Sequence, residues 1–386
     1  MKNGPSDVAM TADDPAKPQG QTCNRSSFGW KSRAFFVIMR SRNGPTSMAK
    51  SNDKLEVAIV LVNEGYASTA IGPIEVFASA GAMWNEMQGA RPDPRFRVRT
   101  ASIDGQPVES AYGLRIAPDC AIADIVAADL VMISASGTLP EEWMSRHAAL
   151  PPWLRERYAA GTLVAGVCSG VAFLAEAGLL DGHRATTHWG VADTFRARYP
   201  DVLWRTDLLI TEDAGLYCGG GVNATSDLSL YLVERLCGHR VAIECSRALL
   251  LDMPRLNQSG YAILPLARPH DDEKVRMIED LLSANFRRDI SVDELAEIAG
   301  MSRRNLVRRF KAATGHMPRA YLQLVRVAAA RTMLEEGAPS IQQVGAAVGY
   351  DDAEFFRRIF KRHNGVTPAA YRERFSRRLR KSWPAD

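Results

Sequence analysis

The sequence lacks any apolar run long enough to cross a membrane. Its longest uninterrupted apolar stretches, such as Val57–Val62 and Ala34–Met39, stop at about half a dozen residues, whereas a membrane helix needs about 20. The N-terminus also lacks a continuous apolar segment followed by small residues, which is the pattern of a secretory signal. We therefore expect no membrane span and a cytoplasmic protein.

Closely paired cysteines are also missing. The six cysteines are scattered along the chain, at Cys23, Cys120, Cys168, Cys218, Cys237 and Cys245. Structural zinc sites use ligands at short paired spacings, so this pattern predicts no metal site. We expect reduced thiols, and the sequence indicates no cofactor.

Length and composition favour a globular protein with more than one domain. At 386 residues the chain exceeds the usual size of a single core, and its hydrophobic share of 46% and charged share of 24% are ordinary. Residues 1–53 are rich in Gly, Pro, Ser and Asn and are predicted to be a disordered tail, with Met48 as an alternative start. The other predicted divisions are an α/β domain over 54–252, a linker over 253–272, a helical domain over 273–378 and a tail over 379–386.

Positive charge is concentrated at the C-terminal end. Residues 301–386 carry 18 Lys and Arg against 7 Asp and Glu, a net charge of +11, although the whole chain has only +4. A basic end on an acidic body suggests a polyanionic partner, because neutralising phosphates releases counterions. Charge alone supports a solvated tail equally well.

Short apolar runs alternate with helical stretches from Leu55 to about Leu250. The predicted strands include Val57–Val62, Phe96–Ala101, Asp129–Ile133 and Leu163–Val167. One predicted helix covers Pro73–Ala82. Alternation of this kind is typical of an α/β domain around a parallel sheet, and the chain after the linker is predicted to be all helical.

Two segments near the C-terminus resemble each other at a period of about fifty residues. Phe310-Lys311 returns as Phe360-Lys361, and Gly315-x-x-Pro318-x-Ala320-Tyr321 returns as Gly365-x-x-Pro368-x-Ala370-Tyr371. Upstream, residues 295–301 match residues 344–350 with an offset of forty-nine. Matched types at matched positions make chance a poor explanation, so we infer a duplicated structural unit.

Each copy has the organisation of a helix-turn-helix: a short apolar helix, a turn at Gly300 or Gly349, and a second, basic helix. A small residue at the turn lets two helices meet closely. The predicted N-caps are Ser291 or Asp293, Ser302 and Ser340. Apolar residues four apart share a helix face and are expected to anchor the second helices. They are Leu306 with Phe310, and Phe356 with Phe360.

The opposite faces of the second helices are left free to meet DNA. The candidate DNA-binding residues are Arg303, Arg304, Val307 and Arg308 in the first copy, and Ala353, Glu354, Arg357 and Arg358 in the second. Arginine pairs bidentately with guanine edges in the major groove, and Glu354 would accept from cytosine. The alternative is an arginine-rich solvated face. Because a helix from Arg319 to Glu335 joins the copies, two successive grooves about 34 Å apart and an asymmetric site per chain are expected.

This part of the chain resembles the AraC/XylS family, whose second unit ends in a Gly-x-Thr-Pro-x-x-Tyr-Arg pattern. Here the pattern is Gly365-Val366-Thr367-Pro368-Ala369-Ala370-Tyr371-Arg372. The resemblance covers residues 273–375. It implies sequence-specific binding of a promoter operator on double-stranded DNA, and usually activation by contact with RNA polymerase.

A strand over Thr162–Val167 runs into Gly166-Val167-Cys168-Ser169-Gly170 and then an apolar helix over Val171–Ala177. Glycines on both sides permit a tight strand-to-helix turn, which is a nucleophile elbow with cysteine in place of serine. The sulfur is expected to be exposed at a helix N-terminus, which favours the thiolate. Thr186-Thr187-His188-Trp189 follows, and a Cys brought to a His can be an activated nucleophile.

This region resembles the ThiJ/PfpI branch of the class I glutamine amidotransferase-like fold, a flavodoxin-like parallel-sheet sandwich. The resemblance rests on the elbow, on Leu174–Gly182 and on Thr-Thr-His188, and it covers about residues 55–250. Both halves in this order resemble the GlxA-like subgroup of AraC regulators, as does Gly72-Pro73-Ile74-Glu75-Val76-Phe77. The resemblance implies a sensor domain for a small, nitrogenous metabolite.

Two departures from these relatives count against catalysis. Thr69 stands where relatives have an acidic residue that supports the cysteine, and His188 is followed by Trp189 and Gly190 instead of the amidotransferase His-x-Glu. A Cys–His pair without its carboxylate lacks the group that orients the base. We therefore expect a binding domain and no enzyme, with Cys168 and His188 as vestiges of a catalytic pair.

The predicted effector site collects residues near the carboxyl ends of the strands, where parallel sheets bind ligands. They are Thr69, Glu75, Gly137, Cys168, His188 and Trp189. Trp189 and Glu75 would suit a cationic nitrogen compound. The alternatives are that Cys168 and His188 are structural core residues, that the chain is a cysteine hydrolase or glyoxalase-like enzyme with an accessory DNA-binding part, or that the first domain only forms the expected homodimer.

Overall fold

In a computed structural model of the chain, residues 54–137, 141–255, 257–262, 270–338 and 340–376 are described. The predicted tails over 1–53 and 379–386, together with Cys23 and Met48, lie outside these ranges. None of the helices in these ranges is long and apolar enough to cross a membrane.

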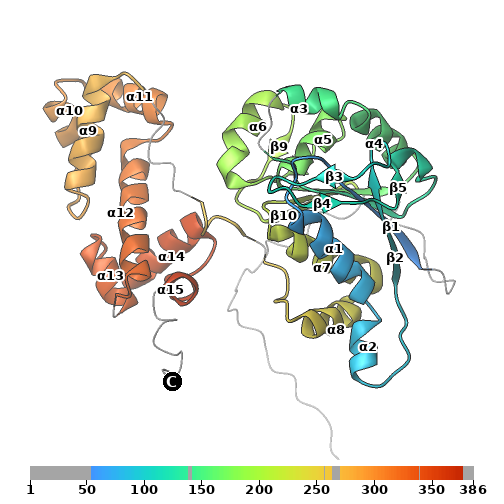
Figure 1. The fold of residues 1–386 in the computed structure, drawn as a ribbon. Coiled ribbons are helices and arrows are strands. Elements are labelled where there is room, and N and C mark those ends of the chain that lie inside the picture. Colours follow the sequence, from blue (N-terminus) through green and yellow to red (C-terminus); the bar gives the residue numbers. More distant parts are fainter. Residues whose placement is uncertain (1–53, 138–140, 256, 263–269, 339, 377–386) are drawn as a thin grey trace, which may run out of the picture. The chain divides into compact units, whose positions relative to one another are not determined.

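A seven-stranded sheet is the centre of the first part of the described chain (Figure 1). Its strand order is β10-β11-β7-β6-β1-β2-β5, and all neighbouring strands are parallel except β10 with β11. The strands are β1 (Leu55–Val60), β2 (Phe96–Ser102), β5 (Cys120–Ala121), β6 (Leu130–Ile133), β7 (Leu163–Val167), β10 (Ile210–Asp213) and β11 (Leu216–Gly219). The expected parallel α/β fold is confirmed.

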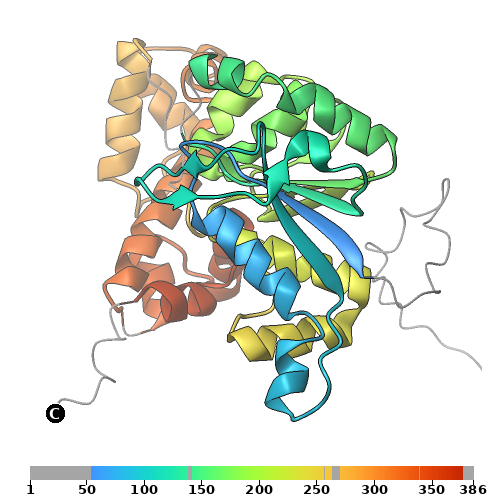
Figure 2. The same cartoon turned by 45° about the vertical axis from the view of Figure 1, so that its right-hand side comes forward.

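Helices cover both faces of this sheet (Figures 1 and 2). Along β1, Val57 and Ile59 pack into one apolar cluster, and Ala58 and Val60 pack into the other, because side chains alternate across a strand. One face carries α1 (Ser68–Ser79), α7 (Ala224–Cys237) and α8 (His239–Leu249). The other face carries α4 (Leu150–Ala159), α5 (Val171–Glu176) and α6 (Ala192–Arg198). Burial on both faces explains the uniformly apolar strands.

Short elements surround this three-layer core. They are α2 (Met83–Met87), α3 (Glu141–Arg146), the paired strands β3 (Val108–Glu109) and β4 (Arg115–Ile116), and the paired strands β8 (Arg184–Ala185) and β9 (Leu203–Trp204). The four predicted strands lie within one or two residues of observed ones. The predicted helix over Pro73–Ala82 is wrong in its limits, because α1 begins at Ser68 and includes Pro73 in its interior.

The chain from Glu273 onward is helical throughout its described part. The helices are α9 (Glu273–Ala284), α10 (Val292–Ile298), α11 (Arg303–Thr314), α12 (Pro318–Glu335), α13 (Ile341–Ala347), α14 (Ala353–Asn364) and α15 (Pro368–Phe375). They form two apolar cores. The first contains Leu295, Leu306, Phe310 and Tyr321, and the second contains Val344, Phe356, Phe360 and Tyr371.

The two cores repeat the same packing, as the sequence repeat predicts. Phe310 meets Tyr321 edge to face at 5.3 Å between ring centroids, and Phe360 meets Tyr371 in the same way at 5.4 Å. The long helix α12 contributes to both cores, with Val325 in the first and Val327 in the second. The chain therefore holds two helix-turn-helix units on one shared helix.

Candidate nucleic-acid interface and effector site

The second helix of each unit, α11 and α14, is a candidate recognition helix with well-defined ends. Ser302 caps α11 by accepting from the Asn305 amide at 3.3 Å, and Asp352 caps α14 through the Glu354 and Phe355 amides. Both helices end in a glycine with positive φ, Gly315 and Gly365. Matching ends give the two helices the same length of twelve residues.

The other predicted caps and anchors are also confirmed. Ser291 caps α10 through the Glu294 amide and Ser340 caps α13 through the Gln343 amide, whereas Asp293 lies in the first turn of α10. The four anchor residues are fully buried: Leu306, Phe310, Phe356 and Phe360. Each candidate recognition helix is therefore fixed to its unit by the face that the sequence predicts.

The opposite face of α11 is open to solvent. Arg303, Arg304 and Arg308 are exposed and Val307 is partly buried. Arg303 pairs loosely with Asp293 at 3.2 Å, and Arg308 donates to the Asn305 side chain at 3.0 Å. Exposed pairs of this kind are weak, so these arginines can turn toward a nucleic acid at little cost.

The corresponding face of α14 is open as well. Glu354, Arg357 and Arg358 are exposed and Ala353 is partly buried. Glu354 pairs with Arg357 at 3.2 Å, and the Arg358 guanidinium lies over the Phe355 ring, 5.2 Å from its centroid. All eight predicted DNA-binding residues thus lie on the two candidate recognition helices and are at least partly accessible.

Two features of this domain were missed from the sequence. Asp272, assigned to the linker, caps α9 through the Val275 amide and pairs bidentately with Arg309 of α11 at 2.7 and 2.8 Å. The Arg309 guanidinium lowers the pKa of Asp272. Arg326 is 6% exposed despite its charge. Sequence pattern alone does not distinguish such internal arginines from those that face DNA.

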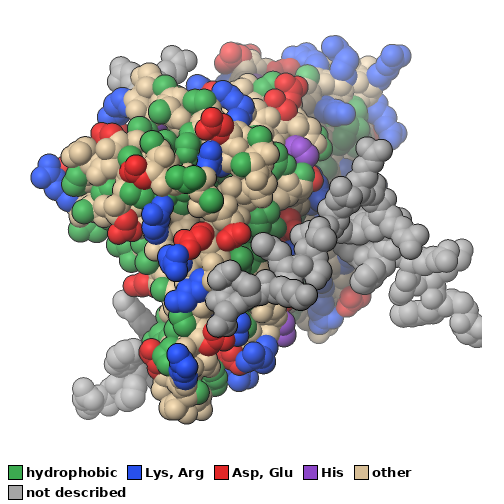
Figure 3. All heavy atoms as spheres, turned by 90° about the vertical axis from the view of Figure 1, so that its right-hand side faces the viewer, with side chains coloured by type: hydrophobic (Ala, Val, Ile, Leu, Met, Phe, Trp, Pro, Cys, Tyr) green, Lys and Arg blue, Asp and Glu red, His purple; other side chains and the backbone are tan. Residues whose placement is uncertain are grey.

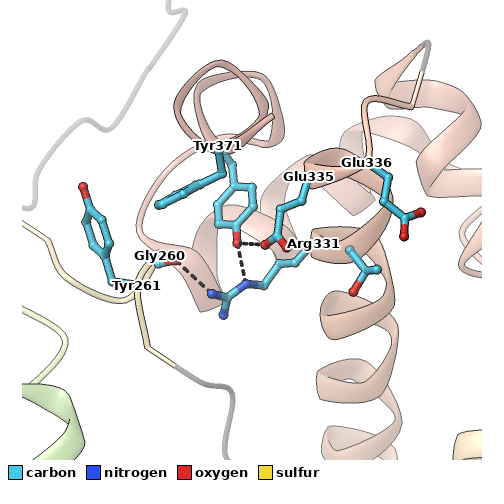
Figure 4. Close-up of a pocket in the computed structure, with 8 residues that line it drawn as sticks. Gly260, Tyr261, Arg331, Glu335, Glu336 and Tyr371 are labelled. Carbon is cyan, nitrogen blue, oxygen red and sulfur yellow. Dashed lines mark hydrogen bonds between the residues drawn. The ribbon is translucent and has the colours of Figure 1, made fainter. Parts of the chain in front are cut away.

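Tyr371 of the Gly-x-Thr-Pro-x-x-Tyr pattern has a structural role (Figure 4). Its hydroxyl donates to Glu335 at 2.5 Å and accepts from Arg331 at 2.8 Å, and Arg331 also donates to the Gly260 carbonyl. Burial, followed by the bond to Glu335, raises the pKa of Tyr371 to about 12. The cavity of about 500 Å³ beside these groups is lined by Gly260, Tyr261, Arg331, Thr332, Glu335, Glu336, Tyr371 and Phe375. Since its central polar groups already pair with one another, we assign it a structural role.

The predicted nucleophile elbow is present at the end of β7. Cys168 has a φ of +53°, a conformation that is strained for a side chain other than glycine. A Cβ at Gly170 would lie 2.4 Å from the Ser134 carbonyl oxygen, and a Cβ at Gly166 would lie 3.1 Å from Val171 Cα. The close approach of the backbone therefore requires glycine at position 170 and leaves little room for a side chain at Gly166, in line with the tight turn that the sequence suggested.

The prediction that Cys168 is an exposed thiolate is wrong. The residue is only 8% exposed, and this burial raises the pKa of its thiol. Its backbone oxygen accepts from the Thr187 hydroxyl at 2.8 Å, and the neighbouring Ser169 hydroxyl donates to the Ser136 carbonyl. Desolvation outweighs the stabilising effect of nearby donors, so the thiol is neutral at physiological pH.

His188 is not placed as a base for this thiol. Its Nδ1 accepts from the Gly190 amide at 3.0 Å, and its ring lies 5.1 Å from the Trp189 ring. Burial lowers the pKa of His188. Among the described residues, no hydrogen bond joins the Cys168 sulfur to His188. The ring is a neutral group that caps its own short turn.

The remaining predicted effector-site residues are Thr69, Gly137 and Glu75, and they differ in burial and contacts. Thr69 is fully buried and its hydroxyl is satisfied, donating to the Tyr66 carbonyl at 2.6 Å and accepting from the Ala135 amide at 2.9 Å. Gly137 follows Ser136, which the elbow contacts. Glu75 is exposed on α1, without a hydrogen-bond or ion-pair partner in the described ranges. The structure therefore does not support Glu75 as part of a wall around Cys168.

A pair of tyrosines near Cys168 was missed. The Tyr66 and Tyr112 rings lie 6.0 Å apart, and Tyr112 is 85% exposed on the turn between β3 and β4. Burial raises the pKa of Tyr66. The Tyr66 amide donates to the Ala135 carbonyl at 3.2 Å, and the next residue, Ser136, accepts from the Ser169 hydroxyl of the elbow. Only the tertiary fold brings these segments together, so a linear pattern could not reveal the pair.

The remaining expectations concern cysteines and metals. The five cysteines within the described ranges are free. In the same part of the chain, no cluster of three or more His, Cys, Asp or Glu side chains is placed to hold a metal ion.

The face in Figure 3 shows Lys and Arg side chains interspersed with Asp and Glu.

Comparison with known proteins matches each of the two parts of the chain to a protein family. The DJ-1/PfpI family matches residues 56–235, and a family described as helix-turn-helix domain matches residues 295–374. The HTH-type transcriptional regulator GbdR of Pseudomonas aeruginosa is 27% identical over 293 residues, covering 75% of this chain and 78% of that protein. GlxA of Rhizobium meliloti, also named as an HTH-type transcriptional regulator, is 26% identical over 284 residues, covering 73% and 86%.

The chain belongs to the AraC-type helix-turn-helix regulators that carry a DJ-1/PfpI domain. It is a DNA-binding transcription regulator, and the predicted GlxA-like resemblance is confirmed. A further relative of this AraC-type regulator is an enzyme: isonitrile hydratase of Pseudomonas putida is 28% identical over 192 residues, covering 48% of this chain and 73% of that protein. This likeness involves less of the chain than the likeness to the regulators does.

Proposed function

We propose that this regulator binds a small nitrogenous metabolite beside Cys168 without converting it, and that binding changes its affinity for a promoter operator. It acts in the cytoplasm as a homodimer and activates transcription through contact with RNA polymerase. The observation that carries the binding role is the buried, neutral Cys168 thiol, which makes no hydrogen bond to His188 within the described part of the chain.

The geometry argues against a nucleophilic role for this thiol. Cysteine catalysis needs a thiolate, an adjacent base and a group that orients that base. Here burial favours the neutral thiol, and the Nδ1 of His188 already accepts a hydrogen bond from the Gly190 amide. The Thr69 hydroxyl forms hydrogen bonds with backbone groups. The same elbow can still position a ligand, because it brings a strained turn to the carboxyl ends of the strands.

The aromatic side chains near the elbow favour a cationic nitrogen compound. Tyr66 and Tyr112 form one ring pair, and His188 with Trp189 forms another. Aromatic faces attract ammonium groups, more strongly where water is excluded. We include these four residues with Gly137 and Cys168 in the proposed site, and we leave out Glu75.

Ligand binding can be tested by thermal unfolding of the full chain with trimethylammonium compounds and with free amino acids. At least one compound should raise the melting temperature of the wild-type chain, since a ligand that prefers the folded state stabilises it. The Tyr66→Ala variant should bind that compound about tenfold more weakly. The Val126→Ala variant is a matched control at an exposed apolar residue and should bind normally. Equal affinities in both variants would contradict the site.

The competing enzyme function has its own assay. The wild-type chain and the Cys168→Ala variant can be compared for turnover of isonitriles, amides and glyoxals. We expect no turnover above background by either protein. Turnover that disappears in the variant would instead make the chain a cysteine-dependent enzyme with an accessory DNA-binding domain.

On the DNA side, we propose that α11 and α14 enter successive major grooves, with Arg303, Arg304, Val307 and Arg308 facing one groove. Ala353, Glu354, Arg357 and Arg358 face the other. Their full or partial exposure on two helices of equal length, each capped by a side chain and ended by a glycine, supports this assignment. Selection of duplexes from a random pool by the full chain should enrich sites with two separate conserved segments. Enrichment of one short segment would contradict the use of both helices.

A further inference from the structure

The middle of α12 contains a buried arginine at the boundary between the two helix-turn-helix cores. Val325 packs into the first core and Val327 into the second, and Arg326 lies between them with 6% of its surface exposed. A charged side chain this deeply buried is expensive unless it is well paired. Its partners therefore indicate what it does.

Those partners belong to both units. The Arg326 Nε donates to the Phe286 carbonyl at 2.7 Å, and another guanidinium nitrogen lies 3.2 Å from Asp289. Both residues lie on the connection between α9 and α10 in the first unit. The same guanidinium lies over the Tyr350 ring, 5.1 Å from its centroid, and Tyr350 belongs to the second unit. A single planar group thus touches both helix-turn-helix units.

Backbone packing at the same place reinforces the contact. A Cβ at Gly349 would lie 2.4 Å from the Arg287 carbonyl oxygen, so the turn of the second unit lies directly against the first. Phe286 packs against both apolar cores. We call the set of Phe286, Arg287, Asp289, Arg326, Gly349 and Tyr350 the inter-unit joint.

The joint gives the two units a second connection beside α12. One helix of 18 residues, roughly 27 Å long, joins the units, but its bending or twisting would move one recognition helix relative to the other. Contacts between the α9–α10 connection and the turn before α14 oppose such movement. Because α11 and α14 are each anchored in their own core, the joint controls the distance and angle between them.

We propose that Arg326 is a specificity-determining positioning residue that, through the inter-unit joint, sets how many base pairs an operator must place between its two contacted segments. This inference rests on the proposed use of both helices. One added base pair moves the second segment by about 3.4 Å and turns it by roughly 35°, so a rigid pair of helices cannot follow it. A loosened pair can follow it.

The test uses the full chain and an operator that the wild-type chain selects from random duplexes. Versions of this operator with one or two base pairs inserted or removed between its conserved segments are titrated by fluorescence anisotropy. The wild-type chain should lose at least about tenfold in affinity on the altered spacings. The Arg326→Met variant keeps most of the apolar stem and should reduce this penalty to about threefold or less.

Two variants separate positioning from general stability. Leu322→Ala removes a buried side chain of the first core on the same helix and should weaken binding by one factor on every spacing. Arg326→Lys keeps the charge but lacks the planar fork, so it should resemble Arg326→Met. A spacing penalty that stays at the wild-type value in Arg326→Met would overturn the proposal.

If Arg326→Met fails to fold, Tyr350→Leu carries the same test, because it removes the ring on which the guanidinium rests. Retention of the full spacing penalty in that variant, or absence of any penalty in the wild-type chain, also refutes the joint. Failure of the wild-type chain to enrich any duplex would instead contradict the DNA-reading function and is distinguishable by that first step.

Discussion

The arginines of the helical domain fall into two classes that the sequence does not separate. Arg309, Arg326 and Arg331 bind carboxylates, carbonyls or a hydroxyl inside the domain. Arg308 and Arg358 are exposed and make only weak local contacts. The first class positions the helices, and the second is available for DNA.

We predict that Arg308→Ala or Arg358→Ala weakens operator binding by about 1–3 kcal/mol and relaxes the base preference at one position, because each removes a candidate contact to a base edge. Affinities for the selected operator and for single-base variants measure both effects. Lys361→Ala, at another exposed basic residue of α14, is the control for phosphate contact. An equal loss on all sequences would reassign the arginine to phosphate contact.

Cys168 gives a prediction that depends on pH. Burial raises the pKa of its thiol, so the thiolate is scarce at neutral pH. Alkylation by iodoacetamide should therefore accelerate only when the pH exceeds the pKa of an ordinary thiol. Site-resolved mass spectrometry should show Cys168 reacting at least about tenfold more slowly at pH 7 than in the unfolded chain. Rapid labelling at pH 7 would indicate an activated thiolate and favour the enzyme alternative.

At the scale of elements, the matching turn glycines of the two repeated units have different surroundings. Gly300 and Gly349 both have positive φ, +60° and +86°. A Cβ at Gly300 would meet only the flexible end of Lys274 at 3.8 Å, whereas at Gly349 it would lie 2.4 Å from the Arg287 carbonyl oxygen. The same substitution should therefore have different costs.

We predict that Gly300→Ala lowers the free energy of unfolding by about 1–2 kcal/mol, the cost of a left-handed residue with a Cβ. Gly349→Ala should lose about 1–3 kcal/mol more, because the backbone contact must open. Urea unfolding of the full chain measures both. Gly337→Ala is the control matched in φ, since it has +92° and open space. Similar losses in all three variants would show that the Gly349 contact is unimportant.

At the scale of the whole molecule, sensing requires that effector and operator affect each other. If the effector changes operator affinity by some factor, the operator must change effector affinity by the same factor. We predict a factor of about 5–150, measured in both directions by titrating each ligand with and without the other. Effector binding that leaves operator affinity unchanged would mean that the DJ-1/PfpI domain serves only assembly.

Much of the architecture follows from local chemistry. Apolar strand runs and their spacing predicted the parallel sheet, and the fifty-residue repeat predicted two helix-turn-helix units with their caps and buried anchors. The elbow at Cys168 was also predictable, because the sequence shows glycines on both sides of a strand-to-helix turn, and the structure leaves no room for a Cβ at Gly170. The limits of α1 were not, since the predicted helix covered Pro73–Ala82, whereas α1 begins at Ser68 and contains Pro73 in its interior.

The sequence by itself determined the two folds, the duplicated recognition helices and the identity of the family, because these depend on periodicity and on residue types at fixed separations. Tertiary structure alone decided that the Cys168 thiol is buried, that Glu75 is exposed, that the Tyr66 and Tyr112 rings meet and that Arg326 joins two units. Burial and pairing depend on which distant segments meet, and a one-dimensional pattern does not contain that information.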